Sequence, residues 1–168
     1  IKCNFEKKLK NNFSTNEITS LWKKWVVPEI FRISLIESYN VDLEINTNKV
    51  TKINLLIRHL LNNLPVQYFF GFTYFYENKI KVDSSVLIPR VETEELVHLV
   101  VSKIKTNTCP NIIDIGTGSG CIAISLAKFF KSSVSIFAVD ITSKALMIAE
   151  SNARINDVQI NLVDLNSG

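Results

Sequence analysis

The sequence predicts an α/β fold: a small N-terminal helical bundle, a β-hairpin connector and the first half of a Rossmann-like parallel sheet flanked by helices. Two observations lead to this prediction. Apolar residues recur at three- and four-residue spacing within residues 1–64, which is the period of an amphipathic helix. From Asn111 onward, β-rich runs alternate with helical patterns, which implies right-handed crossovers in a doubly wound sheet. The predicted domains are residues 1–64, 65–90 and 91–168.

The composition is that of a folded protein with a hydrophobic core. Of the 168 residues, 46% are hydrophobic and 21% are charged, and the net charge is only +3. This weak positive charge gives no support to a surface that mainly binds nucleic acid. The three cysteines form no Cys-x-x-Cys motif and have no histidine cluster beside them, so we expect neither structural zinc nor disulfides, and a cytoplasmic location. The apolar stretch 121–130 has about half the length of a membrane span, so we expect no membrane partner.

Two helices are predicted in the first third of the chain. Ser14-Thr15-Asn16-Glu17 has the form of a capping box, in which each end side chain bonds the other's free backbone amide. The apolar residues behind it are Ile18, Leu21, Trp22 and Trp25, and Pro28 is expected to interrupt this helix. A second helix is expected after Thr47 and should end before Pro65.

Residues 66–90 are rich in aromatic side chains, which favours strands. We expect a hairpin whose turn is Glu77-Asn78-Lys79, followed by the loop Leu87–Arg90. A helix should begin near Thr93 and bury Leu96, Val97 and Val100.

The residue pattern of the last third of the chain predicts three strands, with a helix after each of the first two. The expected strands are 112–115, 134–139 and 159–163, and the expected helices are 122–130 and 143–155. Three strands make half of the usual doubly wound sheet.

The strongest local motif is Asp114-Ile115-Gly116-Thr117-Gly118-Ser119-Gly120, between a strand and a helix. Its glycines allow a tight turn and a close approach of a ligand, and the helix behind it offers free amides. A dinucleotide fingerprint would need a small residue where Cys121 stands, and no Gly-Lys-Ser/Thr follows, so neither a NAD site nor a Walker loop is indicated.

Carboxylates at the strand ends indicate which ligand the loop would hold. Asp114 would repel a pyrophosphate but attract the sulfonium and ammonium groups of S-adenosylmethionine. Asp140 ends the second strand, where a carboxylate can accept hydrogen bonds from both ribose hydroxyls. Asp164 ends the third strand, near the place expected for the adenine, but it serves equally well as a cap of a turn or helix.

Other reactive or aromatic residues have simpler interpretations. His59 and His98 favour packing or surface positions over catalysis. Cys121 opens a helix, which lowers a thiol pKa, but no base accompanies it, so core packing is favoured. The aromatic residues 68–76 indicate a hairpin core more than a platform for stacking bases.

Two further segments resemble the HemK/PrmC family, the release factor glutamine methyltransferases. They are Leu64–Gly71, with its Pro-x-Gln-Tyr, and Val86–Glu94, with its Ile-Pro-Arg-x-Glu-Thr-Glu. The glycine loop and Asp140 follow in the family's order, and Asp164-Leu165-Asn166-Ser167 resembles its segment after the third strand. The resemblance is clear over residues 64–168.

The resemblance implies a helical substrate-binding domain, a hairpin connector and a class I methyltransferase domain. It implies methyl transfer from S-adenosylmethionine to the glutamine side-chain amide in the Gly-Gly-Gln motif of class-1 peptide chain release factors. It implies no direct sequence-specific contact with nucleic acid, and we expect no metal. Together with the residue analysis, it indicates these cofactor-binding residues: Asp114, Gly116, Thr117, Gly118, Ser119, Gly120, Asp140, Asp164 and Leu165.

The sequence departs from the family pattern at two points. Val91 stands where the family has proline, and the family's Asn-Pro-Pro-Tyr motif does not occur in these 168 residues. That motif positions the poorly nucleophilic amide for attack, so we assign no catalytic residue and expect the chain to be inactive by itself. The alternatives are an adenine-N6 DNA or RNA methyltransferase, and a truncated, non-catalytic protein that binds a release factor or the cofactor.

Overall fold

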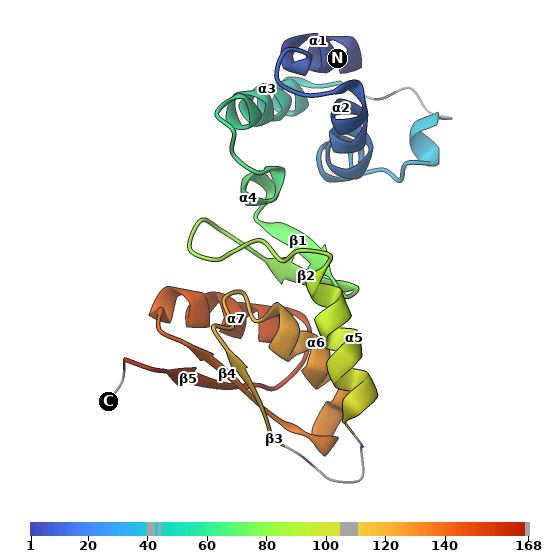
Figure 1. Ribbon diagram of the computed structural model, residues 1–168. Helices are drawn as coiled ribbons and strands as arrows, with labels where there is room; N and C mark the ends of the chain where they lie inside the picture. Colours follow the sequence, from blue (N-terminus) through green and yellow to red (C-terminus); the bar gives the residue numbers. More distant parts are fainter. Residues whose placement is uncertain (40–42, 44, 105–110, 167–168) are drawn as a thin grey trace. The chain divides into compact units, whose positions relative to one another are not determined.

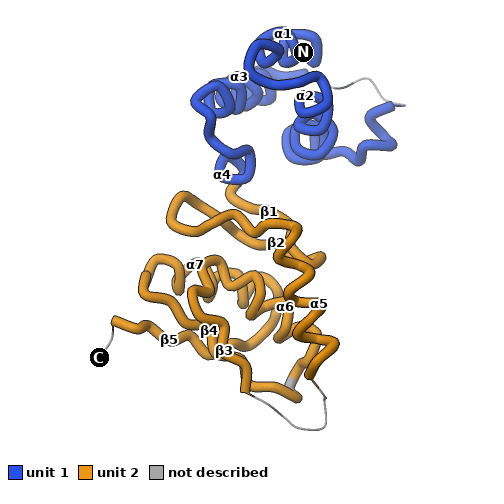
Figure 2. The backbone as a smooth tube through the Cα atoms, viewed as in Figure 1, with its two compact units in different colours: residues 1–70 blue, residues 71–168 orange. Residues whose placement is uncertain are grey.

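The computed structural model describes residues 1–39, 43, 45–104 and 111–166, and the chain forms two compact units, residues 1–70 and 71–168 (Figure 2). Unit 1 is helical and unit 2 is α/β (Figure 1). Cys109 lies outside the described residues. No helix among the described residues is long and apolar enough to cross a membrane.

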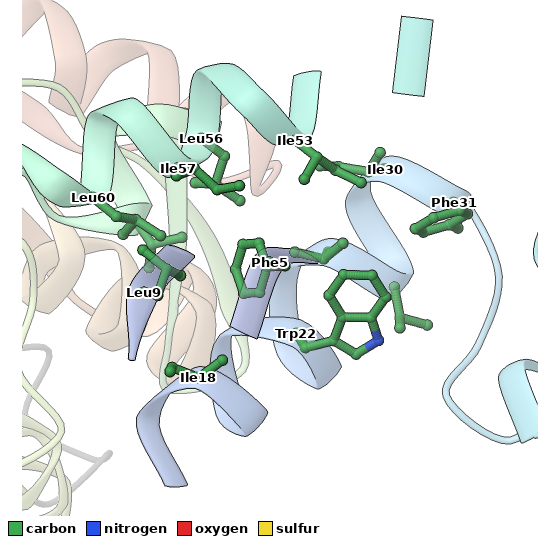
Figure 3. Packing of buried hydrophobic residues seen from close by; sticks show 13 residues of the cluster. Phe5, Leu9, Ile18, Trp22, Ile30, Phe31, Ile53, Leu56, Ile57 and Leu60 are labelled. Carbon is green, nitrogen blue, oxygen red and sulfur yellow. The ribbon is translucent and has the colours of Figure 1, made fainter. Parts of the chain in front are cut away.

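Unit 1 is a bundle of helices around one hydrophobic cluster. Its elements are α1 (Lys2–Leu9), α2 (Thr15–Leu21), the π-helix η1 (Trp22–Phe31), the 3-10 helix η2 (Glu37–Tyr39), α3 (Thr47–Leu61) and α4 (Val66–Phe70). Figure 3 shows α1, α2, η1 and α3 contributing side chains to this core; its labelled residues are Phe5, Leu9, Ile18, Trp22, Ile30, Phe31, Ile53, Leu56, Ile57 and Leu60.

The predicted helix starts are confirmed. The Ser14 amide donates to the Glu17 carboxylate at 2.8 Å, and the Glu17 amide donates to Ser14 Oγ at 3.3 Å, which completes the capping box. Asn46 caps α3 by accepting a hydrogen bond from the amide of Lys49.

The expected break at Pro28 is wrong, because η1 continues through this residue to Phe31. In an α-helix the proline ring clashes with the carbonyl four residues earlier. In the π-helix η1 the hydrogen-bond pattern is i→i+5, so the carbonyl four residues before Pro28 is not the partner of that position. The helix ends instead at Phe31, and its C-cap Arg32 has a left-handed backbone with φ of 62°.

The expectation of strands from residue 66 is also wrong for its first five residues, which form α4. Phe70 stacks on Trp25 with ring centroids 5.2 Å apart, and Phe69 meets the His59 ring edge-on at 5.4 Å. The aromatic residues of this segment therefore pack within the helical unit, and packing outweighs their preference for strands.

Unit 2 begins with a hairpin and continues as a parallel sheet. Its elements are β1 (Phe72–Phe75), β2 (Asn78–Lys81), α5 (Thr93–Lys103), β3 (Asn111–Ile115), α6 (Cys121–Phe130), the 3-10 helix η4 (Lys131–Ser133), β4 (Ser135–Asp140), α7 (Ser143–Ile155) and β5 (Asn161–Asp164). The strand order is β3-β4-β5, all parallel, which confirms the Rossmann-like half sheet.

The two faces of this sheet differ in burial. Helices α6 and α7 contact the strands (Figure 1), and Ile136 and Ala138 of β4 are buried beneath them. Ile113 and Ile115, on the opposite face of β3, are 61% and 77% exposed. Among the described residues, helices α6 and α7 therefore cover one face of the sheet β3-β4-β5. Of the three residues expected to be buried in α5, Val97 is fully buried, but Leu96 is exposed.

The hairpin turn lies one residue earlier than expected. Phe75 pairs with Asn78, so the loop consists of Tyr76 and Glu77, with φ of 48° and 63°. Two positive φ values are those of a type I′ turn, which normally uses Asn and Gly. The Tyr76 amide donates to the Glu94 carboxylate of α5 at 2.8 Å, which offsets part of the strain.

We expect Glu77→Gly to raise the free energy of unfolding by about 0.5–1 kcal/mol, because glycine adopts a positive φ without steric cost. Urea denaturation measures this change. The same substitution at the exposed Glu95 of α5 is the control and should lower stability by about 1 kcal/mol. A loss of stability from Glu77→Gly would contradict the turn geometry.

Candidate functional site

The glycine loop is folded onto the end of β4. The amides of Gly116 and Thr117 donate to the carbonyl of Val139 at 2.8 and 2.9 Å. The Gly118 amide donates to Asp140 Oδ2 at 2.9 Å. Three successive amides are therefore held by two residues of one strand end, which fixes the course of the loop.

The glycines of this loop have two different functions in the fold. Gly116, Gly118 and Gly120 all have positive φ, between 53° and 78°. A Cβ on Gly116 would meet nothing within 4 Å, and one on Gly118 would meet only the Gly116 carbonyl at 4.0 Å. A Cβ on Gly120 would lie 3.0 Å from Cβ of Ala149 in α7. The first two glycines therefore border open space, and the third allows the loop to pack on α7.

Asp140 is the central acid of the site. Its Oδ2 accepts the Gly118 amide, its Oδ1 accepts the Thr142 amide at 2.9 Å, and its carbonyl accepts the Leu165 amide at 3.1 Å. The residue is 8% exposed. A carboxylate offers about four lone-pair positions, so Asp140 can hold the loop and still accept hydrogen bonds from a ligand.

Asp114 lies at the end of β3, immediately before the loop. Its Oδ2 accepts a hydrogen bond from the Thr117 hydroxyl at 2.8 Å. Burial raises the pKa of Asp114 and the nearby charge of Asp140 adds to this, while the bonds from Thr117 and the Ala123 amide oppose it. Two neighbouring acids, one of them desolvated, favour a ligand that brings positive charge.

Asp164 and Leu165 complete the edge of the sheet. Asp164 lies directly opposite Asp140 in the register of β4 and β5. Its Oδ1 accepts the Asn166 amide at 2.8 Å, so the turn-capping interpretation of this acid is realised in the fold. Leu165 is 56% exposed and offers apolar surface beside the two acids. The strand ends thus bring three acids, the loop and one exposed leucine to one edge.

The other residues of the loop are buried. Thr117 and Ser119 have little exposed surface, so their side chains stabilise the loop. Burial raises the pKa of Cys121 to about 11, and this thiol is therefore protonated and unreactive at neutral pH. This agrees with core packing.

The two histidines have structural partners. His59 Nε2 lies 2.8 Å from the Pro65 carbonyl, and His98 Nδ1 lies 3.3 Å from the Tyr76 hydroxyl. Among the described residues, no group of three or more His, Cys, Asp and Glu side chains could hold a metal ion.

Sequence reasoning missed the buried asparagines of unit 2, Asn78, Asn152 and Asn156. Asn152 is completely buried in α7 and donates from Nδ2 to the Ser119 carbonyl of the loop at 2.9 Å. One signal for it was present, since Asn152 falls on the same helix stripe as Ala145 and Ala149. Asparagine is a poor helix former and is rarely buried, so its presence there indicates a specific partner.

The comparisons with known proteins point to methyltransferases. Residues 92–168 match the family described as Ribosomal protein L11 methyltransferase (PrmA). A release factor glutamine methyltransferase of Flavobacterium psychrophilum is 37% identical over 98% of this chain and 59% of its own length. One of Lactococcus lactis is 44% identical over 63% of this chain and 38% of its own. The chain therefore spans less than two thirds of the curated relatives that it matches.

Several solved structures are also similar to this chain. The Pyrococcus abyssi tRNA (uracil-54, C5)-methyltransferase in complex with S-adenosyl-L-homocysteine is 18% identical, with a TM-score of 0.47. The match covers 57% of this chain and 24% of that one.

We expect Gly120→Ala to destabilise the protein more than Gly116→Ala. Both substitutions place a side chain at positive φ, which costs about 1 kcal/mol. Only the Gly120 variant also forces a methyl group against Ala149, which adds about 1–3 kcal/mol. Urea denaturation of the two variants side by side measures the difference, and equal losses of stability would contradict the close packing of the loop on α7.

Proposed function

We propose that the glycine-loop crevice binds S-adenosylmethionine, because the chain is similar to release factor glutamine methyltransferases, one of which is 37% identical to it over 98% of this chain. The observation that carries this proposal is the buried Asp140 beside an open glycine loop. S-adenosylmethionine supplies a methyl group on a positively charged sulfur, which makes it transferable to a nucleophile. The residues of this chain bind and orient that donor.

Each part of the crevice has a chemical counterpart in the cofactor. Asp140 would accept hydrogen bonds from the ribose hydroxyls with lone pairs that the loop leaves unused. Asp114 would attract the sulfonium and ammonium groups, directly or through water. Asp164 and Leu165 would border the adenine, one with an acceptor and one with apolar surface. The space over Gly116 and Gly118 admits the ligand without a Cβ clash.

We further propose that the acceptor is the glutamine side chain of the Gly-Gly-Gln motif in class-1 release factors. The names of the relatives and the segments Leu64–Gly71 and Val86–Glu94 support this substrate. Unit 1 would help to hold the protein substrate, as the substrate-binding domain predicted for residues 1–64. It contains ten Lys and Arg against six Asp and Glu, so its charge favours an acidic protein surface.

The reaction that we propose needs a group that holds the amide nitrogen in line with the methyl group. No catalytic residue is assigned for this role, since the family's Asn-Pro-Pro-Tyr motif does not occur in these 168 residues. A cytoplasmic location follows from the proposed substrate, which acts in translation.

We expect Asp140→Ala to weaken the affinity for S-adenosylmethionine by about 1–3 kcal/mol, because charge-assisted hydrogen bonds to the ribose and to the Gly118 amide are lost. Isothermal titration calorimetry measures this change. Glu150→Ala is the control, because it removes one exposed acid of α7 and should leave the affinity unchanged. An unchanged affinity of the Asp140 variant would argue against the crevice.

For the full-length natural protein, we expect labelled methyl groups from S-adenosylmethionine to appear in a release factor and not in duplex DNA. Replacing the glutamine of the Gly-Gly-Gln motif should abolish the label, because the proposed acceptor of the methyl group is the side-chain amide of that glutamine. The alternative of an adenine-N6 methyltransferase predicts the reverse. Label found only in DNA would refute the proposed substrate.

A further inference from the structure

The outer edge of β2 is paired with Asn152 of α7 and with Asn156, the C-cap of that helix. Asn152 Oδ1 accepts the Lys81 amide at 2.6 Å, and its Nδ2 donates to the Lys81 carbonyl at 2.9 Å. Asn156 Nδ2 donates to the Lys79 carbonyl at 2.9 Å. In an antiparallel pair, alternate residues direct their backbone groups away from the partner strand. Two asparagines one helical turn apart therefore take the place of a neighbouring strand along β2.

Asn152 has a second partner that Asn156 lacks. Its Nδ2 also donates to the carbonyl of Ser119 in the glycine loop at 2.9 Å. A side-chain amide has two N–H donors and one carbonyl oxygen, so the three bonds to Lys81 and Ser119 employ all of them. The side chain is completely buried, so solvent cannot replace a bond that is lost.

The hydrogen bond to the Ser119 carbonyl constrains a whole peptide group of the loop. The Ser119 carbonyl and the Gly120 amide belong to the same planar peptide group. The Gly120 amide donates to the Thr117 carbonyl at 2.8 Å, so this plane closes the turn of the loop. Holding the carbonyl therefore holds the orientation of the loop from Thr117 to Gly120.

We propose that Asn152 is a positioning residue that couples the β1–β2 hairpin to the glycine loop. Its side chain bonds both β2 and the Ser119 carbonyl, so a shift of β2 would shift the peptide plane of Ser119 and Gly120. Its effect on cofactor affinity rests on the function proposed above, whereas the coupling itself does not. Other contacts hold the hairpin without reaching the loop: Asn78 bonds to Ser125 and Lys128 of α6, and Asn156 bonds to Lys79.

Hydrogen exchange of the cofactor-free chain tests the coupling, with Asn152→Ala and Asn156→Ala as matched variants. Both variants remove bonds to β2, so amides of residues 79–82 should exchange faster in both. Amides of residues 117–121 should exchange about tenfold faster in Asn152→Ala only, as expected for one lost buried hydrogen bond. Unchanged exchange in the loop, or equal acceleration by both variants, would overturn the proposal.

Calorimetry with S-adenosylhomocysteine then tests the consequence for the ligand, at a temperature where both variants are folded. Asn152→Ala should raise the Kd about tenfold and Asn156→Ala less than twofold. Equal Kd values for the two variants would refute the positioning role in cofactor binding. If the unmodified chain binds no S-adenosylhomocysteine but the exchange pattern holds, the proposed function fails and the coupling remains.

The unmodified chain provides a second test if Asn152→Ala does not fold. The amides of Lys81 and Gly120 should then be exposed in the same local opening of the native state. Their protection factors should stay within about threefold of each other as urea is added below the unfolding transition. A clearly different dependence on urea would show that the hairpin and the loop open independently and would overturn the coupling.

Discussion

The end of β4 is the constraint on which the rest of unit 2 depends. The Val139 carbonyl and the Asp140 carboxylate together hold three successive amides of the glycine loop. Val139 and Asp140 lie at the end of β4, so these bonds continue the pairing of the sheet into the loop. They set the loop above the sheet edge, keep Asp140 beside it and leave space over Gly116 and Gly118. The carboxylate of Asp140 therefore fixes the loop and also lies where it can accept hydrogen bonds from a ligand.

Buried amide side chains extend this arrangement to the hairpin. Asn78, Asn152 and Asn156 attach β2 to α6, to α7 and to the C-cap of α7. An amide suits this role, because it donates and accepts like a peptide group but carries no charge to desolvate. The hairpin and the glycine loop of unit 2 are therefore joined by hydrogen bonds through Asn152 of α7.

Local patterns predicted much of this fold, while long-range contacts decided the rest. The helix 143–155 was predicted with its observed bounds, and the glycine loop with its flanking acids was located from residue type and order. The residue types of Phe69 and Phe70 predict strand, whereas their packing on His59 and Trp25 favours a helix. The partners of Asn152 lie 33 and 71 residues away, and no local pattern encodes them.

We propose that the strand-end crevice of unit 2 binds S-adenosylmethionine. The most direct measurement is a nitrogen-15 NMR titration of the chain with S-adenosylhomocysteine, read amide by amide. We expect saturable shifts to concentrate at residues 116–121, 140–142 and 164–166, while the amides of unit 1 stay unchanged. Absence of saturable shifts at these positions, or shifts confined to unit 1, would contradict it.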